Sequence, residues 1–259
     1  MPLITRYMTT DGPRFGIVEN GMIYNLPTNP FRVAALQGEN MIGPAEDLLL
    51  VSPVAPTKII CVGHNYVSHA QEHGVPVPEN PMLFFKPPSA LTGYDTPIVL
   101  PTDVGRVDLE AELAVVIGKR ARKVSQDEAL DYVFGYTCAN DVSARALQKA
   151  DGQWGRAKGF DTFCPLGPWI NTNIENPNNL NVKARLNSDM VIDGNTSDMI
   201  FDVSYLIEFI SHVMTLEVGD VILTGTPEGV SQIHDGDRVE IEIECIGTLR
   251  NWVESEPTN

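Results

Sequence analysis

Short apolar runs separated by polar turns fill the N-terminal part of the chain. The dipeptide Asn20-Gly21 lies between two β-rich runs, which is typical of a two-residue β-hairpin turn. A helix is expected near Phe31–Gln37. Pro53 and Pro56 follow, and because proline interrupts helices and strands alike, we expect the chain to divide near this point.

Strand-like runs are more frequent after this boundary. β-branched and apolar residues predict strands at Lys58–Val62, Pro97–Leu100, Ala111–Ile117, Val133–Ala139, Val221–Leu223 and Val239–Ile246. Helical periodicity predicts helices at Ser125–Tyr132, Val142–Lys149 and Val203–Val213. Ser125 and Glu128 have the spacing of a capping box. Many short strands and few helices, without regular alternation, predict a strand-rich mixed α/β fold, either a curled sheet or a β-roll, rather than a doubly wound sheet.

Charge and composition narrow the class of protein. The 259 residues are 43% hydrophobic, as in an ordinary globular protein, and the formal net charge is −16. This excess of acid disfavours nucleic acid and anionic membranes, although a bound cation can still admit an anionic substrate. No apolar run is long enough to cross a bilayer, and none of the four cysteines forms a C-x-x-C pair. These features predict a cytoplasmic protein with reduced thiols.

Two glutamates begin one of the predicted strands. Glu110 and Glu112 are two positions apart, so their carboxylates point to the same face of the strand. Neighbouring carboxylates repel each other unless a cation lies between them. Asp141 follows the next predicted strand, and three carboxylates without a nearby cysteine favour a hard ion such as Mg²⁺ or Mn²⁺. Two surface acids on an exposed strand would show the same spacing.

A second polar group begins at Asp141. Asp141, Arg145 and Gln148 are spaced i, i+4 and i+7, which would place a metal ligand, a cation and an amide on one face of a helix. An ordinary Asp–Arg pair on a solvated helix has the same spacing. The spacing therefore favours a substrate- and metal-binding site at this position but is also compatible with an ordinary surface pair.

A histidine-rich segment precedes both groups. His69 and Glu72 are three residues apart, so on a helical turn the carboxylate can orient the imidazole and raise its basicity, which suits a general base. His69, Glu72 and His73 also spell H-x-x-E-H, which resembles the motif of inverted zinc peptidases. A proline-rich loop follows Gly74, where a peptidase would need a continuing helix.

Several separate blocks resemble the fumarylacetoacetate hydrolase family over about Lys58 to Val253. The blocks are Cys61–Tyr66 with His69 and Glu72, Phe84–Pro87, Val107–Leu113, Asn140–Arg145 with Gln148, Lys158–Pro168 and Leu223–Val230. No single block is decisive, but their order and spacing together are specific to this family.

The resemblance implies a fold, an assembly and a set of functional residues. It implies a mixed β-sandwich roll, usually a homodimer, with a small N-terminal domain over residues 1–52 and a catalytic domain over residues 53–259. The metal ligands implied are Glu110, Glu112 and Asp141, for Mg²⁺ or Mn²⁺. The catalytic residues implied are His69, Glu72 and Lys158. The substrate contacts implied are Arg145, Gln148 and Thr226.

A small 2-oxo acid is the substrate that this chemistry suits. Breaking the bond beyond C3 leaves an enolate that the metal would stabilise as a Lewis acid. Hydrolysis of acylpyruvates and related β-diketo acids, with water activated by His69, is the leading expectation. Decarboxylation of oxaloacetate, and decarboxylation or isomerisation of 2-hydroxy-diene-dioate intermediates of aromatic catabolism, share the enolate and stay open. A non-catalytic protein that binds a metal or a ligand on the same fold is a further alternative.

Overall fold

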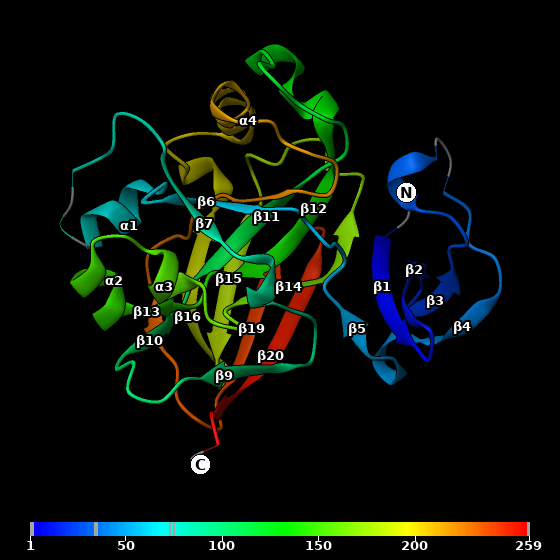
Figure 1. The fold of residues 1–259 in the computed structure, drawn as a ribbon, viewed down its shortest axis with the longest axis horizontal. Coiled ribbons are helices and arrows are strands. Elements are labelled where there is room, and N and C mark those ends of the chain that lie inside the picture. Colours follow the sequence, from blue (N-terminus) through cyan, green and yellow to red (C-terminus); the bar gives the residue numbers. More distant parts are fainter. Residues whose placement is uncertain (1–2, 34–35, 73, 75, 258–259) are drawn as a thin grey trace.

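The computed structural model describes residues 3–33, 36–72, 74 and 76–257, and it is rich in strands (Figure 1). The N-terminal elements are β1 (Leu3–Thr9), β2 (Gly12–Glu19), β3 (Met22–Asn25), η1 (Pro30–Arg32), β4 (Met41–Pro44), η2 (Ala45–Asp47) and β5 (Leu50–Val51), where η denotes a 3-10 helix. Asn20 and Gly21 join β2 to β3 with φ angles of 49° and 77°, which confirms the predicted hairpin.

The remaining elements follow from residue 59 onward. The strands are β6 (Ile59–Gly63), β7 (Met82–Lys86), β8 (Leu91–Thr92), β9 (Pro97–Leu100), β10 (Val107–Leu109), β11 (Ala111–Ile117), β12 (Val133–Asn140), β13 (Ser143–Ala144), β14 (Cys164–Asn171), β15 (Asn181–Leu186), β16 (Asp189–Asn195), β17 (Val221–Leu223), β18 (Ser231–Gln232), β19 (Arg238–Ile243) and β20 (Gly247–Ser255). The helices are α1 (Val67–Glu72), η3 (Pro88–Ala90), η4 (Gln126–Tyr132), α2 (Arg145–Asp151), α3 (Gly155–Lys158), η5 (Thr196–Asp198) and α4 (Val203–Val213). No helix in this described part of the chain is long and apolar enough to span a membrane.

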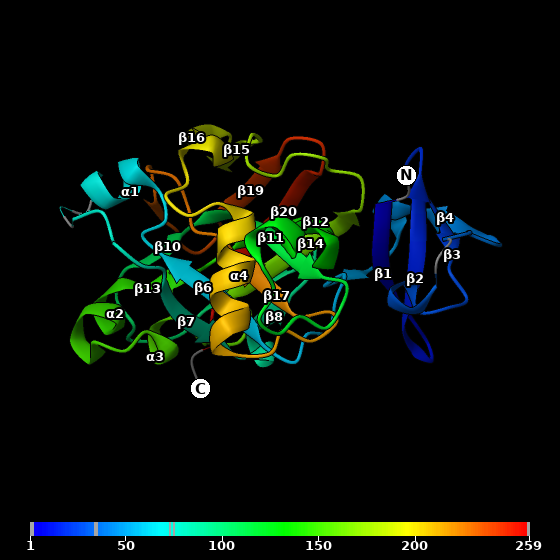
Figure 2. The same ribbon diagram turned by 90° about the horizontal axis from the view of Figure 1, so that it is seen from above.

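One large sheet contains both the N-terminal strands and strands of the rest of the chain. Its strands run in the order β4-β3-β2-β1-β14-β12-β11-β17-β6-β7, with β5 paired to β1 and β8 paired to β14. Figure 2 shows β1 to β4 on one side of the molecule and α1, α2 and α3 gathered on the opposite side. Since β1 pairs with β14 as well as with β2, a division at residue 52 stays a prediction.

A second sheet packs on the first and encloses the main core. This sheet has the order β16-β15-β19-β20-β9, and a small third sheet has the order β13-β10-β18. Leu113 and Val115 of β11 belong to the same core as Ile241 of the second sheet, whereas Ala114 and Val116 point into a separate core on the other face. Because both faces of β11 are covered, its sequence reads as a continuous apolar run. The predicted strand-rich mixed α/β fold is confirmed.

Three of the expected helices differ from the structure, and the one expected at Val142–Lys149 begins only at Arg145. The helix expected near Phe31–Gln37 is wrong, because η1 ends at Arg32 and Val33 is extended with φ −122° and ψ 143°. Residues 34–35 lie outside the described part. The segment after Ser125 is a 3-10 helix, and Ser125 Oγ donates to the Glu128 carboxylate at 2.7 Å instead of capping a backbone N–H.

Candidate active site

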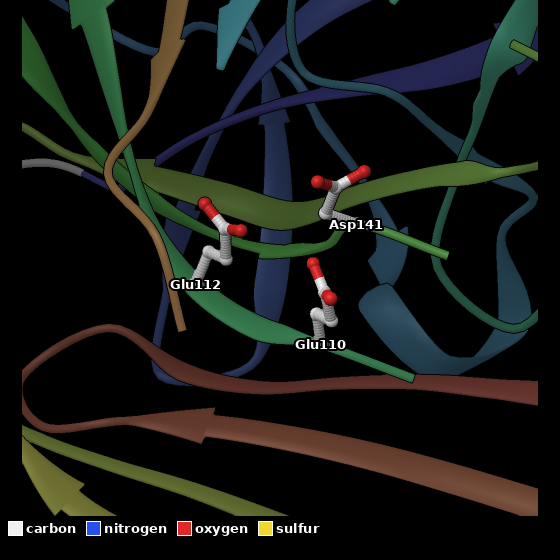
Figure 3. A group of neighbouring side chains, drawn as sticks. All are labelled: Glu110, Glu112 and Asp141. Atoms are coloured by element: carbon white, nitrogen blue, oxygen red, sulfur yellow. The ribbon is translucent and has the colours of Figure 1, made fainter. Parts of the chain in front are cut away.

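Strand pairing brings three carboxylates to one place. In the antiparallel pair of β11 and β12, Ala111 lies opposite Asn140, so Glu110 and Asp141 meet at the end of the ladder. The Glu110 N–H donates to Asn140 Oδ1 at 2.9 Å, and the Asp141 N–H donates to the Glu110 carbonyl at 2.9 Å. Oxygen atoms of Glu110, Glu112 and Asp141 lie within 4.8 Å of one another, and all three residues are buried (Figure 3).

Three cations neutralise two of these carboxylates. Lys158 Nζ bridges them, 2.8 Å from Glu110 Oε2 and 2.6 Å from Asp141 Oδ2. Arg145 Nη2 is 2.5 Å from Glu110 Oε1, and Lys86 Nζ is 2.5 Å from Asp141 Oδ1. Burial would raise the pKa of Glu110, but the charges of Lys158 and Arg145 outweigh it and hold that pKa well below its usual range. Glu110 is therefore ionised, and both carboxylates are paired with cations.

Glu112 is different from the other two members of the group. Within the described residues it forms no ion pair, and its Oε2 atom accepts a hydrogen bond from the Gly225 N–H at 2.6 Å. Burial, together with the negative charges of Asp141 and Glu110, raises its pKa well above the usual value. A buried carboxylate beside two others, without a cation of its own, matches the requirement of a divalent ion for oxygen ligands. The residues therefore fit a hard cation that Glu110, Glu112 and Asp141 would hold.

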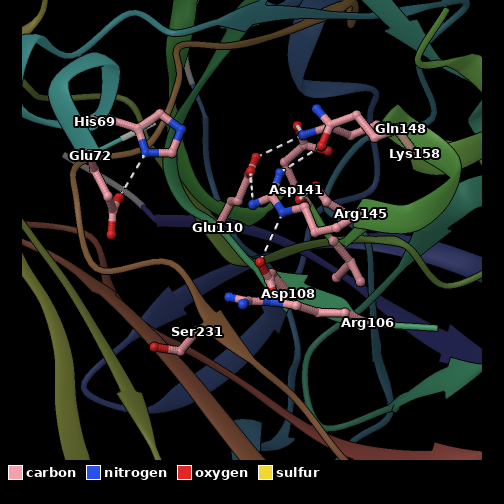
Figure 4. A network of polar contacts seen from close by, with 12 residues as sticks. His69, Glu72, Arg106, Asp108, Glu110, Asp141, Arg145, Gln148, Lys158 and Ser231 are labelled. Carbon is pink, nitrogen blue, oxygen red and sulfur yellow. Dashed lines mark hydrogen bonds and ion pairs between the residues drawn. The ribbon is translucent and has the colours of Figure 1, made fainter. Parts of the chain in front are cut away.

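The histidine and glutamate of the predicted dyad lie next to this group (Figure 4). His69 Nδ1 is 3.3 Å from Glu72 Oε2, and the imidazole belongs to the lining of the same pocket as the carboxylates. The Gly229 N–H lies 3.3 Å from both oxygens of Glu72, which ties α1 to the loop after β17. A Cβ at Gly229 would lie 2.0 Å from the Val191 carbonyl oxygen, so only glycine allows this approach. His73, the third member of H-x-x-E-H, lies outside the described residues.

The remaining predicted residues also line the pocket, but the local structure around them differs from the one expected. Asp141 precedes the helix, because residues 143–144 form β13 and α2 begins only at Arg145. The expected single helical face is therefore wrong for Asp141. Arg145 and Gln148 do share a face, with Arg145 Nη1 2.9 Å from Gln148 Oε1. Thr226 Oγ1 is buried in the pocket wall without a hydrogen-bond partner among the described residues.

These side chains surround a cavity of about 510 Å³. His64, Phe84 and Trp154 form an aromatic part of its wall, with 5.0 Å between the Phe84 and Trp154 ring centroids. Lys158 Nζ lies 5.0 Å from the Phe84 centroid and 5.6 Å from the Trp154 centroid, within range of a cation–π interaction. Burial lowers the pKa of Lys158, but Asp141 and Glu110 reverse this and leave it raised, so the amine keeps its proton.

Two charged residues near the site were not singled out from the sequence. Lys86 is fully buried and also donates to the Val142 carbonyl, with Nζ 3.2 Å from the oxygen. Asp108 is buried and accepts from Arg106 Nε at 2.7 Å and from Arg145 Nε at 2.8 Å. Both residues lie within the segments that resemble the family. The feature of the sequence that could have identified them is a charged residue within a short apolar run.

Comparison with known proteins gives one family and several named relatives. The family described as fumarylacetoacetate (FAA) hydrolase, C-terminal, matches residues 58–254. Oxaloacetate tautomerase fahd2, mitochondrial, from Xenopus laevis is 43% identical over 232 residues, which cover 85% of this chain and 73% of that protein.

Solved structures resemble the chain over nearly its whole length. The crystal structure of 2-hydroxyhepta-2,4-diene-1,7-dioate isomerase from Mycobacterium marinum has a TM-score of 0.91 at 42% identity and covers 100% of both chains. The crystal structure of maleylpyruvate hydrolase from Sphingobium sp. SYK-6, in complex with manganese(II) and pyruvate, has a TM-score of 0.83 at 34% identity and covers 99% of this chain and 100% of that chain. The fold expected from the resemblance is thereby confirmed, and this chain belongs to the fumarylacetoacetate hydrolase family of enzymes.

Proposed function

We propose that the chain is a divalent-metal-dependent enzyme that forms and uses the enolate of a small 2-oxo acid. The observation that carries this proposal is the placement around one cavity of the three buried carboxylates and of His69, whose imidazole is paired with Glu72. A divalent cation, Mg²⁺ or Mn²⁺, held by Glu110, Glu112 and Asp141 would supply Lewis-acid stabilisation of the negative charge that develops on the 2-oxo oxygen.

The side chains of the pocket would stabilise charge, transfer protons and orient the substrate. Lys158 keeps its proton and adds fixed positive charge beside Glu110 and Asp141, where it stabilises the same developing charge. His69, oriented through Nδ1 by Glu72, takes up a proton and later returns it. Arg145, Gln148 and Thr226 supply donors that orient the substrate. Their positions in one pocket support these roles.

Two candidate reactions differ in the group from which His69 takes a proton. In hydrolysis of an acylpyruvate, the leading expectation, His69 deprotonates water that attacks the distal carbonyl, and the bond beyond C3 breaks. In tautomerisation or isomerisation, His69 removes a proton from C3 and a proton returns at an oxygen or at a later carbon. The second candidate is favoured by the oxaloacetate tautomerase at 43% identity and the heptadienedioate isomerase at 42% identity. Decarboxylation of oxaloacetate uses the same enolate without attack by water.

Substrate assays with stripped and reloaded protein test the proposal. Chelator-treated protein, reloaded with Mn²⁺ or Mg²⁺, is supplied separately with acetylpyruvate, with enol-oxaloacetate and with keto-oxaloacetate. Release of pyruvate and acetate indicates hydrolysis, loss of enol absorbance indicates tautomerisation, and release of carbon dioxide indicates decarboxylation. We expect at least one of these reactions to depend on the added ion. Full turnover in excess chelator, or none with any of the three, would overturn the proposal.

A further inference from the structure

The cations that contact the buried carboxylates of this site are already paired. Four carboxylates are buried in or directly behind the cavity wall, those of Asp108, Glu110, Glu112 and Asp141. Lys86 and Lys158 contact Asp141, Lys158 and Arg145 contact Glu110, and Arg145 and Arg106 contact Asp108. A divalent ion held by Glu110, Glu112 and Asp141 would attract the carboxylate at the 2-oxo acid end of a substrate.

A second substrate carboxylate would then need a cation of its own. Arg145 and Lys158 line the cavity, but Arg145 uses Nε, Nη1 and Nη2 on protein partners, and Lys158 is held by two carboxylates. Lys149 also lines the cavity, and its ammonium group makes no hydrogen bond or ion pair with any described residue. Lys149 is thus the cation of the described lining that remains available to an anion.

The position of Lys149 also gives the direction of the substrate. Lys149 lies one helical turn after Arg145 on α2, so the two side chains share a face. Exposure increases along this path, from Asp141 with 0% through Arg145 with 17% to the exposed Lys149. A ligand whose 2-oxo acid end lies at the carboxylate group would therefore extend toward Lys149 at the mouth of the cavity.

We propose that Lys149 binds the distal carboxylate of a dicarboxylic 2-oxo acid and so gives this site its preference for diacids over monoacids. The inference rests on the proposed function, because it requires the 2-oxo acid end to lie at Glu110, Glu112 and Asp141. It selects diacids among the candidate substrates and ranks a simple monocarboxylic acylpyruvate below them.

Binding measurements with two unreactive probes test this role. Full-length protein loaded with Mn²⁺ is titrated calorimetrically with pyruvate, which has one carboxylate, and with 2-oxoglutarate, which has two. The variants are Lys149→Gln, Lys149→Arg and, as a matched control, Lys119→Gln, an exposed lysine outside the cavity lining. We expect the wild type to bind 2-oxoglutarate more tightly than pyruvate. Lys149→Gln should lower the affinity for 2-oxoglutarate by about fivefold, as expected for a partly exposed charged contact. It should change the affinity for pyruvate by less than about twofold.

The control variants make the result specific to this position. Lys149→Arg should retain most of the affinity for 2-oxoglutarate, and Lys119→Gln should match the wild type. If the wild type binds pyruvate but Lys149→Gln leaves the affinity for 2-oxoglutarate unchanged, or weakens both probes equally, the role of Lys149 is overturned while the proposed function stands. If the wild type binds neither probe in the presence of Mn²⁺, the proposed function itself fails, and this inference fails with it.

Discussion

Lys158 and Asp141 face each other inside the cavity, with Lys158 Nζ 2.6 Å from Asp141 Oδ2 and both side chains at most 2% exposed. The same ammonium group contacts Glu110, so one lysine bridges two of the three carboxylates. Within the part of the chain that the structure describes, the hydrogen bond that Glu112 accepts comes from the Gly225 N–H. Among the described residues, Glu112 is therefore the member of this group that lacks a cationic partner, and burial beside Asp141 and Glu110 disfavours its charged form.

Glu112→Gln should stabilise the metal-free protein and remove its response to metal. The amide keeps an oxygen that can accept from Gly225 but no longer places a buried charge near Glu110 and Asp141. We expect the free energy of unfolding in chelator to rise by about 1–3 kcal/mol. Thermal unfolding with and without Mn²⁺ measures both effects. A metal-dependent increase in Tm equal to that of the wild type would contradict a ligand role for Glu112.

The difference in unfolding free energy between Glu112→Gln and the wild type should depend on pH. Because the pKa of Glu112 is raised in the folded state, folding favours its protonated form. Its contribution to stability is complete below the pKa of the unfolded chain and is lost as pH rises through the folded pKa. The advantage of Gln at position 112 in metal-free protein should therefore grow with increasing pH. Urea unfolding at several pH values measures this difference, and an advantage that shrinks with pH would be evidence against it.

Lys86→Met should destabilise the metal-free protein by about 3–5 kcal/mol, because it leaves the buried Asp141 Oδ1 without its ammonium partner. Mn²⁺ should recover a larger share of stability in this variant than in the wild type, since the ion would meet a more negative site. Urea unfolding with and without Mn²⁺ gives both numbers.

Lys58→Met is the matched control for this variant. Lys58 pairs with the buried Asp220, but Asp220 also accepts from the Thr57 N–H at 3.1 Å and from Thr57 Oγ1 at 2.7 Å. The loss of stability should be smaller, and the response to Mn²⁺ should match that of the wild type. An equal response to Mn²⁺ in both lysine variants would separate Lys86 from the carboxylate site.

Asp108→Asn should impair substrate orientation more than metal binding. Asp108 holds Arg145 through Nε, and Arg145 in turn reaches Gln148 and Glu110. We expect kcat/KM to fall by about tenfold, corresponding to roughly 1.4 kcal/mol, with the Mn²⁺ affinity nearly unchanged. Arg106→Gln is the control, because the Arg106 side chain is 53% exposed and should matter little. Similar losses in both variants would show that Asp108 does not act through Arg145.

His69→Ala should reduce turnover by about 10²–10⁴-fold, the usual contribution of a general base, while Mn²⁺ binding is retained. Glu72→Gln should cause a smaller loss, because it removes the charge that orients the imidazole and leaves an amide in its place. Steady-state kinetics and calorimetric titration with Mn²⁺ separate the two effects. Unchanged turnover in His69→Ala would remove the pair from the reaction.

Strand spacing and the family blocks carried most of what the sequence could predict. Glu110 and Glu112 share a face because side chains alternate along β11, and the register with β12 adds Asp141. The helical spacing of Asp141 was misleading, because residues 143–144 pair with β10 before the helix starts. Local periodicity does not record such a pairing with a distant strand.

Lys86 and Asp108 illustrate what local patterns do not contain. Lys86 meets Asp141 across 55 positions of sequence, and Asp108 meets Arg145 across 37. A lysine or aspartate next to apolar residues is usually exposed, so burial of both charges becomes evident only when the partner is known. The dyad was predictable for the opposite reason, because His69 and Glu72 lie on one short helix.

Titration of Mn²⁺ into chelator-stripped wild type and Asp141→Asn is the most direct test of the carboxylate site. Calorimetry or electron paramagnetic resonance gives the number of ions bound per chain and the affinity. We expect one ion per chain in the wild type, and an affinity at least about tenfold lower in Asp141→Asn, because one of three charged ligands is lost. Equal affinity in the two proteins, or no binding by the wild type, would contradict a metal site at Glu110, Glu112 and Asp141.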